Sequence, residues 1–200
     1  MCWRDFYRHI LWDEPRLETE AFKVAWKDFP WRDSAADLER WTQGMTGFPI
    51  VDAGMRQLQT TGWMHNRVRM IVASFLTKHL LLNWQDGERV FNKLLLDGDL
   101  ANNNGGWQWV AGCGVDAAPY FRVFNPVSQG EKFDADAAYI KRFVPELEGL
   151  SVKEAHQPWT SLRPPKSYPD PMISLNEGRE RFLETAKTAF TEGWGIGIRE

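Results

Sequence analysis

The sequence is 200 residues long, with a formal net charge of −3, two cysteines and eleven tryptophans, and this length suits one domain with a substantial core. The slight negative charge excludes a nucleic-acid binder that works by bulk attraction, so any contact with DNA needs a local cationic patch. Two cysteines outside any CxxC spacing exclude a disulfide framework and a thiolate metal site, and no apolar stretch reaches the length of a membrane span, so we expect a soluble, cytoplasmic protein.

Helical periodicity starts almost at the first residue. The apolar residues of this stretch recur at the spacing of an amphipathic helix, and they are Trp3, Phe6, Tyr7, Ile10 and Leu11. No capping residue precedes this helix, so we expect the chain to begin inside a longer helix, as a fragment of a larger protein. Residues 13–32 are expected to be irregular.

Capping residues then mark two helices. Residues 34–44 run from a Ser34 cap to a Gly44 stop, and residues 49–62 run from Pro49 at a first helical position to a Gly62 cap. Residues 64–82 predict a further helix, whose buried stripe is Val68, Ile71, Val72, Phe75, Leu76 and Leu80. A neighbouring line on the same helix could face a cavity, and it consists of Asn66, Met70 and Ala73.

The second half of the chain also reads as helical. Residues 83–100 predict a helix that places Trp84 and Phe91 on one side and ends at the 97–99 turn, and Asp99 suits the cap of the next helix. A shorter helix follows Phe133 and runs to about residue 142, and an exposed helix is predicted over 174–190. No window shows the alternation of a strand, so the fold class is all-α. The tail 193–200 is interpreted as a loose end.

The acidic turn before "ANNNGGWQW" has two readings. A calcium loop is excluded, because its ligand, glycine and glutamate positions hold Ala101, Asn102 and Gln108. Asp97 and Asp99 are then either a helix cap and turn, or acceptors for the N–H and hydroxyl groups of a ligand. The dense Asn and Gly residues beside them favour a ligand.

No catalytic triad, phosphate-binding loop or zinc-binding helix is present, so the chemistry must come from a cofactor. Indoles, amides and paired carboxylates suit a flat, redox-active ring. Arg67 and Arg69 lie among apolar and amide side chains, a setting that indicates phosphate contact more than simple solvation. His65 is interpreted as a half-buried, hydrogen-bonded residue without a chemical role.

At residues 46–81 and 97–134 the chain closely resembles the FAD-binding domain of class I cyclobutane pyrimidine dimer DNA photolyases, in the photolyase and cryptochrome family. The resemblance extends over nearly the whole chain. It implies that residues 1–200 are the C-terminal helical domain, truncated at its N-terminus and lacking the antenna domain and part of the FAD site. It also implies a lyase that repairs pyrimidine dimers in DNA by electron transfer from excited, reduced FAD. The alternatives are a cryptochrome-type blue-light sensor and a non-catalytic helical fragment.

The resemblance implies a role for individual residues as well. An electron relay to the flavin would consist of Trp31, Trp84 and Trp107. The FAD contacts would be Trp63, Arg69, Asp97, Gly98, Asp99 and Asn103. The contacts with DNA and the dimer would be Trp3, Arg4, Asn66, Arg67, Met70, Trp109 and Gln129. A second, antenna chromophore would bind the missing domain, and the protein is expected to act as a monomer.

Overall fold

The computed structural model describes residues 2–192, and within them the regular structure is helical, with one isolated bridge between Arg32 and Leu82. The all-α class is confirmed. The α-helices are α1 (Cys2–Asp13), α2 (Ala35–Thr42), α3 (Pro49–Thr61), α4 (Asn66–Ser74), α5 (Trp84–Leu94), α6 (Leu100–Ala111), α7 (Pro126–Phe133), α8 (Ala138–Phe143), α9 (Val152–His156) and α10 (Leu175–Glu192).

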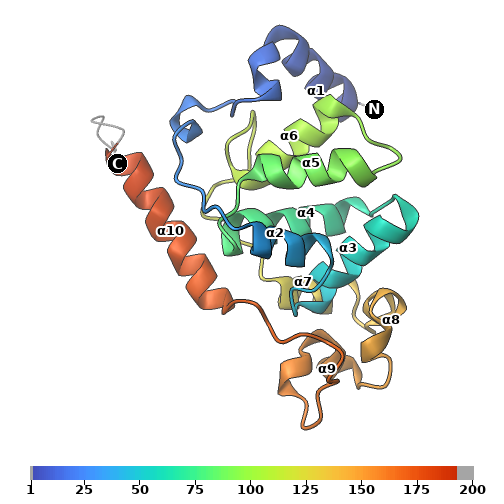
Figure 1. Cartoon of the computed structure of the whole chain (residues 1–200). Coiled ribbons are helices and arrows are strands. Elements are labelled where there is room, and N and C mark those ends of the chain that lie inside the picture. Colours follow the sequence, from blue (N-terminus) through green and yellow to red (C-terminus); the bar gives the residue numbers. More distant parts are fainter. Residues whose placement is uncertain (1, 193–200) are drawn as a thin grey trace.

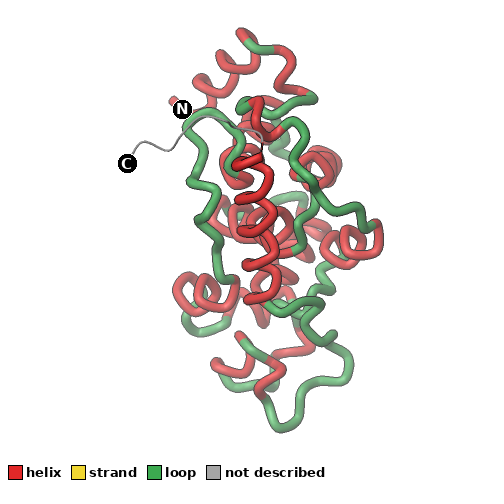
Figure 2. The backbone as a smooth tube through the Cα atoms, turned by 90° about the vertical axis from the view of Figure 1, so that its left-hand side faces the viewer, coloured by secondary structure: helices red, strands yellow, loops and turns green. Residues whose placement is uncertain are grey.

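Two helices organise the packing. The α3 helix contacts α4, α7 and α8, and α6 contacts α1, α4 and α5. In Figure 1, α1 lies above α6 and α5, the α2, α3 and α4 helices form the middle, and α7 to α9 lie below. Figure 2 shows that α10 runs along the outside of this stack. The α6 helix therefore lies against α1, α4 and α5.

The centre of the core is Trp41 on α2, whose side chain is fully buried. Its indole N–H donates to the carbonyl oxygen of Val72 at 3.1 Å, which satisfies the one polar atom of the ring. Its ring centroid lies 6.3 Å from that of Phe91 on α5 and 6.1 Å from that of Trp107 on α6. The Trp41 indole therefore connects α2 with α4, α5 and α6.

The predicted caps are confirmed. The Ser34 hydroxyl accepts from the backbone N–H of Asp37 at the start of α2. Pro49 opens α3, and Gly62 closes it in the left-handed conformation at φ 67°. This conformation is available to glycine without steric cost.

The predicted helix over 64–82 is divided in the structure. The α4 helix ends at Ser74 and continues as a π-helical segment, Phe75–His79, in which the N–H of Leu80 bonds to the carbonyl of Phe75. The wider turns place Lys78 inside the protein, where its ammonium donates to the carbonyls of Tyr120 and Arg122. Burial lowers the pKa of Lys78 to about 7. The expected apolar stripe of this segment is buried throughout.

The structure also differs from the sequence analysis at two other helices. The α7 helix was not predicted, although Asn125 caps it and Pro126 occupies its first position. The last helix was predicted to be exposed, yet Phe182 and Ala186 on α10 are fully buried. It packs against the π-helical segment, which offers apolar surface that sequence periodicity does not reveal. The predicted loose tail at 193–200 lies outside the described residues.

Candidate functional site

A cavity of about 580 Å³ opens between α1, α4, α5 and α6. This volume lies within the usual range of small-molecule sites, roughly 300–1,000 Å³. Many residues that were predicted from the sequence to bind a cofactor or substrate line it. They are Trp3, Asn66, Arg69, Met70, Asp97, Gly98, Asp99, Asn103, Trp107 and Trp109. Segments far apart in the sequence thus share one wall, as a common ligand requires.

The wall formed by α4 is the line of residues expected from helical spacing. Asn66, Met70 and Ala73 all border the cavity. The α4 helix starts at this point because the Nδ1 atom of His65 accepts from the backbone N–H of Arg67 at 3.1 Å. The expectation of a half-buried His65 was wrong, because its side chain is exposed and serves as the helix cap.

The two carboxylates of the acidic turn are both bound by arginines. Asp97 accepts two hydrogen bonds from the Arg69 guanidinium, at 3.0 and 2.9 Å. Asp99 accepts from Arg8 at 2.6 Å, and this hydrogen bond holds the pKa of Asp99 below its usual value. Asp99 also caps α6 by accepting from the N–H of Asn102. Asp99 therefore both caps α6 and borders the cavity.

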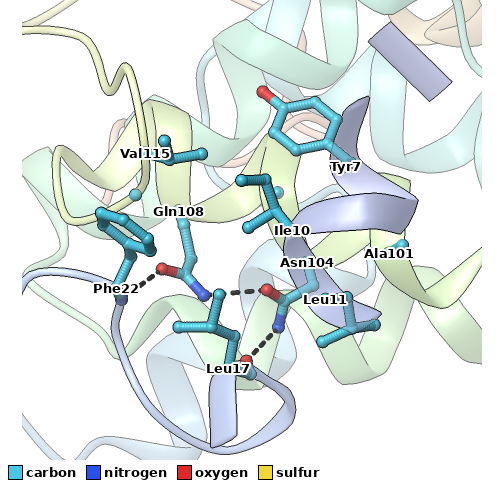
Figure 3. Close-up of a pocket in the computed structure, with 11 residues that line it drawn as sticks. Tyr7, Ile10, Leu11, Leu17, Phe22, Ala101, Asn104, Gln108 and Val115 are labelled. Carbon is cyan, nitrogen blue, oxygen red and sulfur yellow. Dashed lines mark hydrogen bonds between the residues drawn. The ribbon is translucent and has the colours of Figure 1, made fainter. Parts of the chain in front are cut away.

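The Asn-rich segment is divided between the cavity and the core. On the cavity side, Asn103 is half-buried and its side-chain N–H groups bond to α5. On the other side, Asn104 donates to the carbonyl of Leu17 at 2.9 Å and accepts from Gln108 at 2.8 Å. Gln108 in turn accepts from the backbone N–H of Phe22 at 2.8 Å. Figure 3 shows this network beside a small pocket of about 20 Å³ between α1 and α6.

The two adjacent glycines of α6 also face different neighbours. A Cβ atom on Gly105 would lie 2.2 Å from Cδ1 of Tyr7, so the absence of a side chain lets α1 lie directly on α6. A Cβ atom on Gly106 would meet nothing within 4 Å, and Gly106 borders the cavity. Glycine at 106 keeps the cavity open, whereas glycine at 105 serves helix packing.

The three predicted relay tryptophans lie on α6, on α5 and in the segment before α2. Trp107 borders the cavity and packs so tightly on α5 that a Cβ on Gly87 would lie 2.1 Å from its Cη2 atom. Trp84 is buried one turn before Gly87 on the same helix. Trp31 is half-buried, and the next residue, Arg32, donates its N–H to the carbonyl of Leu81 at 2.8 Å. The chain around Trp31 therefore lies beside the start of α5.

The remaining predicted DNA and cofactor contacts lie outside the cavity lining. The Arg67 guanidinium lies 4.5 Å from the ring centroid of Phe133, and the Lys132 ammonium lies 5.4 Å from it. Gln129 is half-buried on the same helix, α7. The N-terminus of α4 and the end of α7 therefore bring two cations to one surface.

Arg4 and Trp63 lie apart from the residues just described. Arg4 is exposed beside Trp3 on α1 and forms an ion pair with Asp5. Trp63 is 47% exposed and its ring packs edge-on against His65. Neither residue borders the cavity.

Sequence reasoning assigned no site role to Tyr7 or Asp116, which border the cavity as well. Tyr7 was interpreted only as part of an apolar stripe. Asp116 adopts a left-handed backbone at φ 48°, a conformation that Asp tolerates better than most residues. Its place at the cavity depends on the course of the 112–125 loop, which has no periodic signal.

Comparison with known proteins decides the family. Residues 1–188 match the family described as "FAD binding domain of DNA photolyase". The chain belongs to this family.

Individual relatives agree with this assignment. The chain is 49% identical over 193 residues to the protein named deoxyribodipyrimidine photo-lyase of Escherichia coli, and the match covers 94% of this chain and 41% of the relative. A class III photolyase structure from Agrobacterium tumefaciens matches with a TM-score of 0.92 and 48% identity, covering 95% of this chain and 41% of that one. A Synechocystis cryptochrome structure matches with a TM-score of 0.84 and 35% identity, covering 92% and 40%. The chain thus spans about two fifths of the length of these relatives.

The residues present fit a flavin ring. Met70, Ala73 and Phe91 supply apolar walls for a flat ring, and Asn103 and the Arg69 and Asp97 pair supply polar groups at its edge. The open space at Gly106 leaves room for the ring against α6. None of the helices in residues 2–192 combines the length and the apolar character needed to cross a membrane.

Proposed function

We propose that this photolyase domain repairs cyclobutane pyrimidine dimers in DNA under blue light, as a deoxyribodipyrimidine photolyase with FAD in the cavity. One observation carries the proposal. A single cavity is bordered by aromatic rings suited to a flipped-out dimer, Trp3 and Trp109, and by polar groups suited to a flavin, at Asn103 and Asp97. The name deoxyribodipyrimidine photo-lyase, shared by curated relatives at about half identity, supports it.

The flavin would lie against α6 and α4. When bound, reduced FAD would supply an excited electron to the dimer. The Arg69 and Asp97 pair and Asp99 would bind polar atoms of the cofactor, and Gly98 would let the turn approach it closely. Asn103 would accept a hydrogen bond from the ring through its side-chain oxygen. A second, antenna chromophore would bind outside this helical domain.

The dimer would enter from the side of α1 and the start of α4. Extruding a damaged nucleotide from the duplex costs only a few kcal/mol, because it already pairs and stacks poorly. Trp3 and Trp109 would stack on the extruded dimer, and Asn66 and Met70 would bound its other side. These four side chains exclude water from the reacting ring and fix its orientation.

The DNA backbone would lie across the cationic surface formed by α4 and α7. Arg67 and Lys132 flank the exposed Phe133 ring there, and Gln129 lies on the same helix. Together with Arg4, these side chains would bind phosphates and set the position of the duplex without reading its sequence.

We expect the enzyme to be a cytoplasmic monomer. The class I assignment stays a prediction, because a class III photolyase is among the similar structures.

The proposal is tested by a chimera in which this chain replaces the matching residues of the Escherichia coli relative. The FAD-loaded, reduced chimera should convert a thymine-dimer oligonucleotide to thymines under blue light and leave it intact in the dark. A chimera that holds FAD but repairs nothing, under conditions in which the unmodified relative repairs, would contradict the proposal and favour the cryptochrome-type sensor.

A further inference from the structure

Asn92 is an exposed residue in the last turns of α5, outside the cavity lining. Asparagine is a poor helix former, and a straight-chain polar residue such as the adjacent Lys93 is favoured at exposed helical positions. The side chain of Asn92 nevertheless has a defined partner. Its Oδ1 atom accepts a hydrogen bond from the side-chain Nδ2 of Asn103 at 2.8 Å.

The hydrogen bonds of the Asn103 carboxamide define its orientation. Its Nδ2 atom has two N–H donors, one bonded to the backbone carbonyl of Glu88 at 3.1 Å and the other to Asn92. A backbone carbonyl accepts only, so the Glu88 contact requires nitrogen, not oxygen, on the α5 side of the amide. With both donors directed at α5, the oxygen of Asn103 has no protein partner within residues 2–192 and is free for a ligand in the cavity.

We propose that Asn92 is a positioning residue that holds the Asn103 carboxamide with its oxygen available to the cavity. The backbone carbonyl of Glu88 determines that the nitrogen of the amide faces α5. The Oδ1 atom of Asn92 accepts from the second N–H and so restricts rotation of the amide. The inference rests on the proposed function only for the identity of the ligand. If FAD occupies the cavity, the group that meets the Asn103 oxygen is an N–H of the reduced flavin ring.

The primary test follows the side-chain amide protons of Asn103 by NMR in the flavin-free chain, and Asn103→Asp identifies their signals by removing them. In Asn92→Leu, one of the two protons should exchange with water about tenfold faster, which corresponds to the loss of one net hydrogen bond. Asn92→Asp keeps an acceptor of the same shape and should restore slow exchange. Lys93→Leu is the matched control at the adjacent exposed position of α5 and should leave both protons unchanged.

Unchanged exchange in Asn92→Leu, or an equal increase in Lys93→Leu, would overturn the positioning role. The second measurement is the reduction potential of FAD bound to the chimera with the Escherichia coli relative. A loosened acceptor stabilises the N–H of the reduced ring less, so the potential should fall in Asn92→Leu, and an unchanged potential would contradict the link to the flavin. A chimera that binds no FAD would overturn the proposed function, while the exchange result would still decide the role of Asn92.

Discussion

The carboxyl group of Glu88 lies in a buried environment that disfavours its charged form. It lies on α5 with 5% of its surface exposed, and its Oε1 atom has no hydrogen-bond partner among the described residues. Burial raises its pKa from 4.5 to about 7. The folded protein therefore binds this proton more tightly than the unfolded chain does. Glu88 consequently stabilises the fold most below pH 4.5, and this stability is lost as the pH rises to about 7.

Glu88→Gln should remove this dependence. Glutamine has the shape of the protonated acid and carries no charge, so the free energy of unfolding should no longer fall between pH 4.5 and 7, and the variant should be the more stable protein at pH 8. Urea unfolding across this pH range measures the slope. The exposed Glu148 provides a control, since Glu148→Gln should keep the native slope. An identical slope in native protein and Glu88→Gln would contradict the raised pKa.

At the same scale, the sequence predicted which residue types meet at the cavity but not which partner each one takes. Asn66, Met70 and Asn103 were assigned to the site by spacing and resemblance, and they line one cavity. The adjacent Asn104 has the same side chain and a structural role, because α6 turns it toward Leu17 instead. The arginine partners of Asp97 and Asp99 come from α4 and α1, and no local pattern identifies such long-range pairs.

Among the elements, the docking of α1 on α6 depends on Gly105, whereas Gly106 keeps the cavity open. Gly105→Ala should destabilise the protein by about 1–3 kcal/mol, because the new methyl group overlaps the Tyr7 ring. Gly106→Ala should stabilise the flavin-free protein by about 0.5–1 kcal/mol, since alanine is the better helix residue and the space is empty. Thermal unfolding measures both changes.

The same pair of variants separates packing from ligand binding. Because Gly106 borders the cavity, its added methyl group should weaken FAD binding in the chimera even as it stabilises the helix. Equal effects of the two substitutions on stability would show that α1 does not pack on Gly105 as described. Undiminished FAD affinity in Gly106→Ala would place the ring away from this part of α6.

Helices with clear local signals were predicted well. Ser34, Pro49, Gly62 and Asp99 mark helix ends through chemistry that depends on a few neighbouring residues. The π-helical segment was not predictable in this way, because its apolar stripe is equally compatible with an α-helix. The burial of α10 likewise depends on a distant surface.

For the whole molecule, we propose that a flavin bound in the cavity would exchange electrons along two separate routes. One route would lead to the dimer, which Trp3 and Trp109 would hold. The other would lead to the flavin through Trp31, Trp84 and Trp107. Trp107 would be the residue of the second route next to the flavin, since it borders the cavity.

The most direct test is to measure light-driven FAD reduction and dimer repair in the same flavin-loaded Trp107→Phe chimera. Phenylalanine keeps an aromatic ring at low cost, about 1.5 kcal/mol or less, but is not readily oxidised. Reduction of oxidised FAD by light should nearly vanish, while repair by chemically reduced protein persists. Undiminished photoreduction, or photoreduction and repair that decline together with the amount of folded protein, would contradict the two-route account.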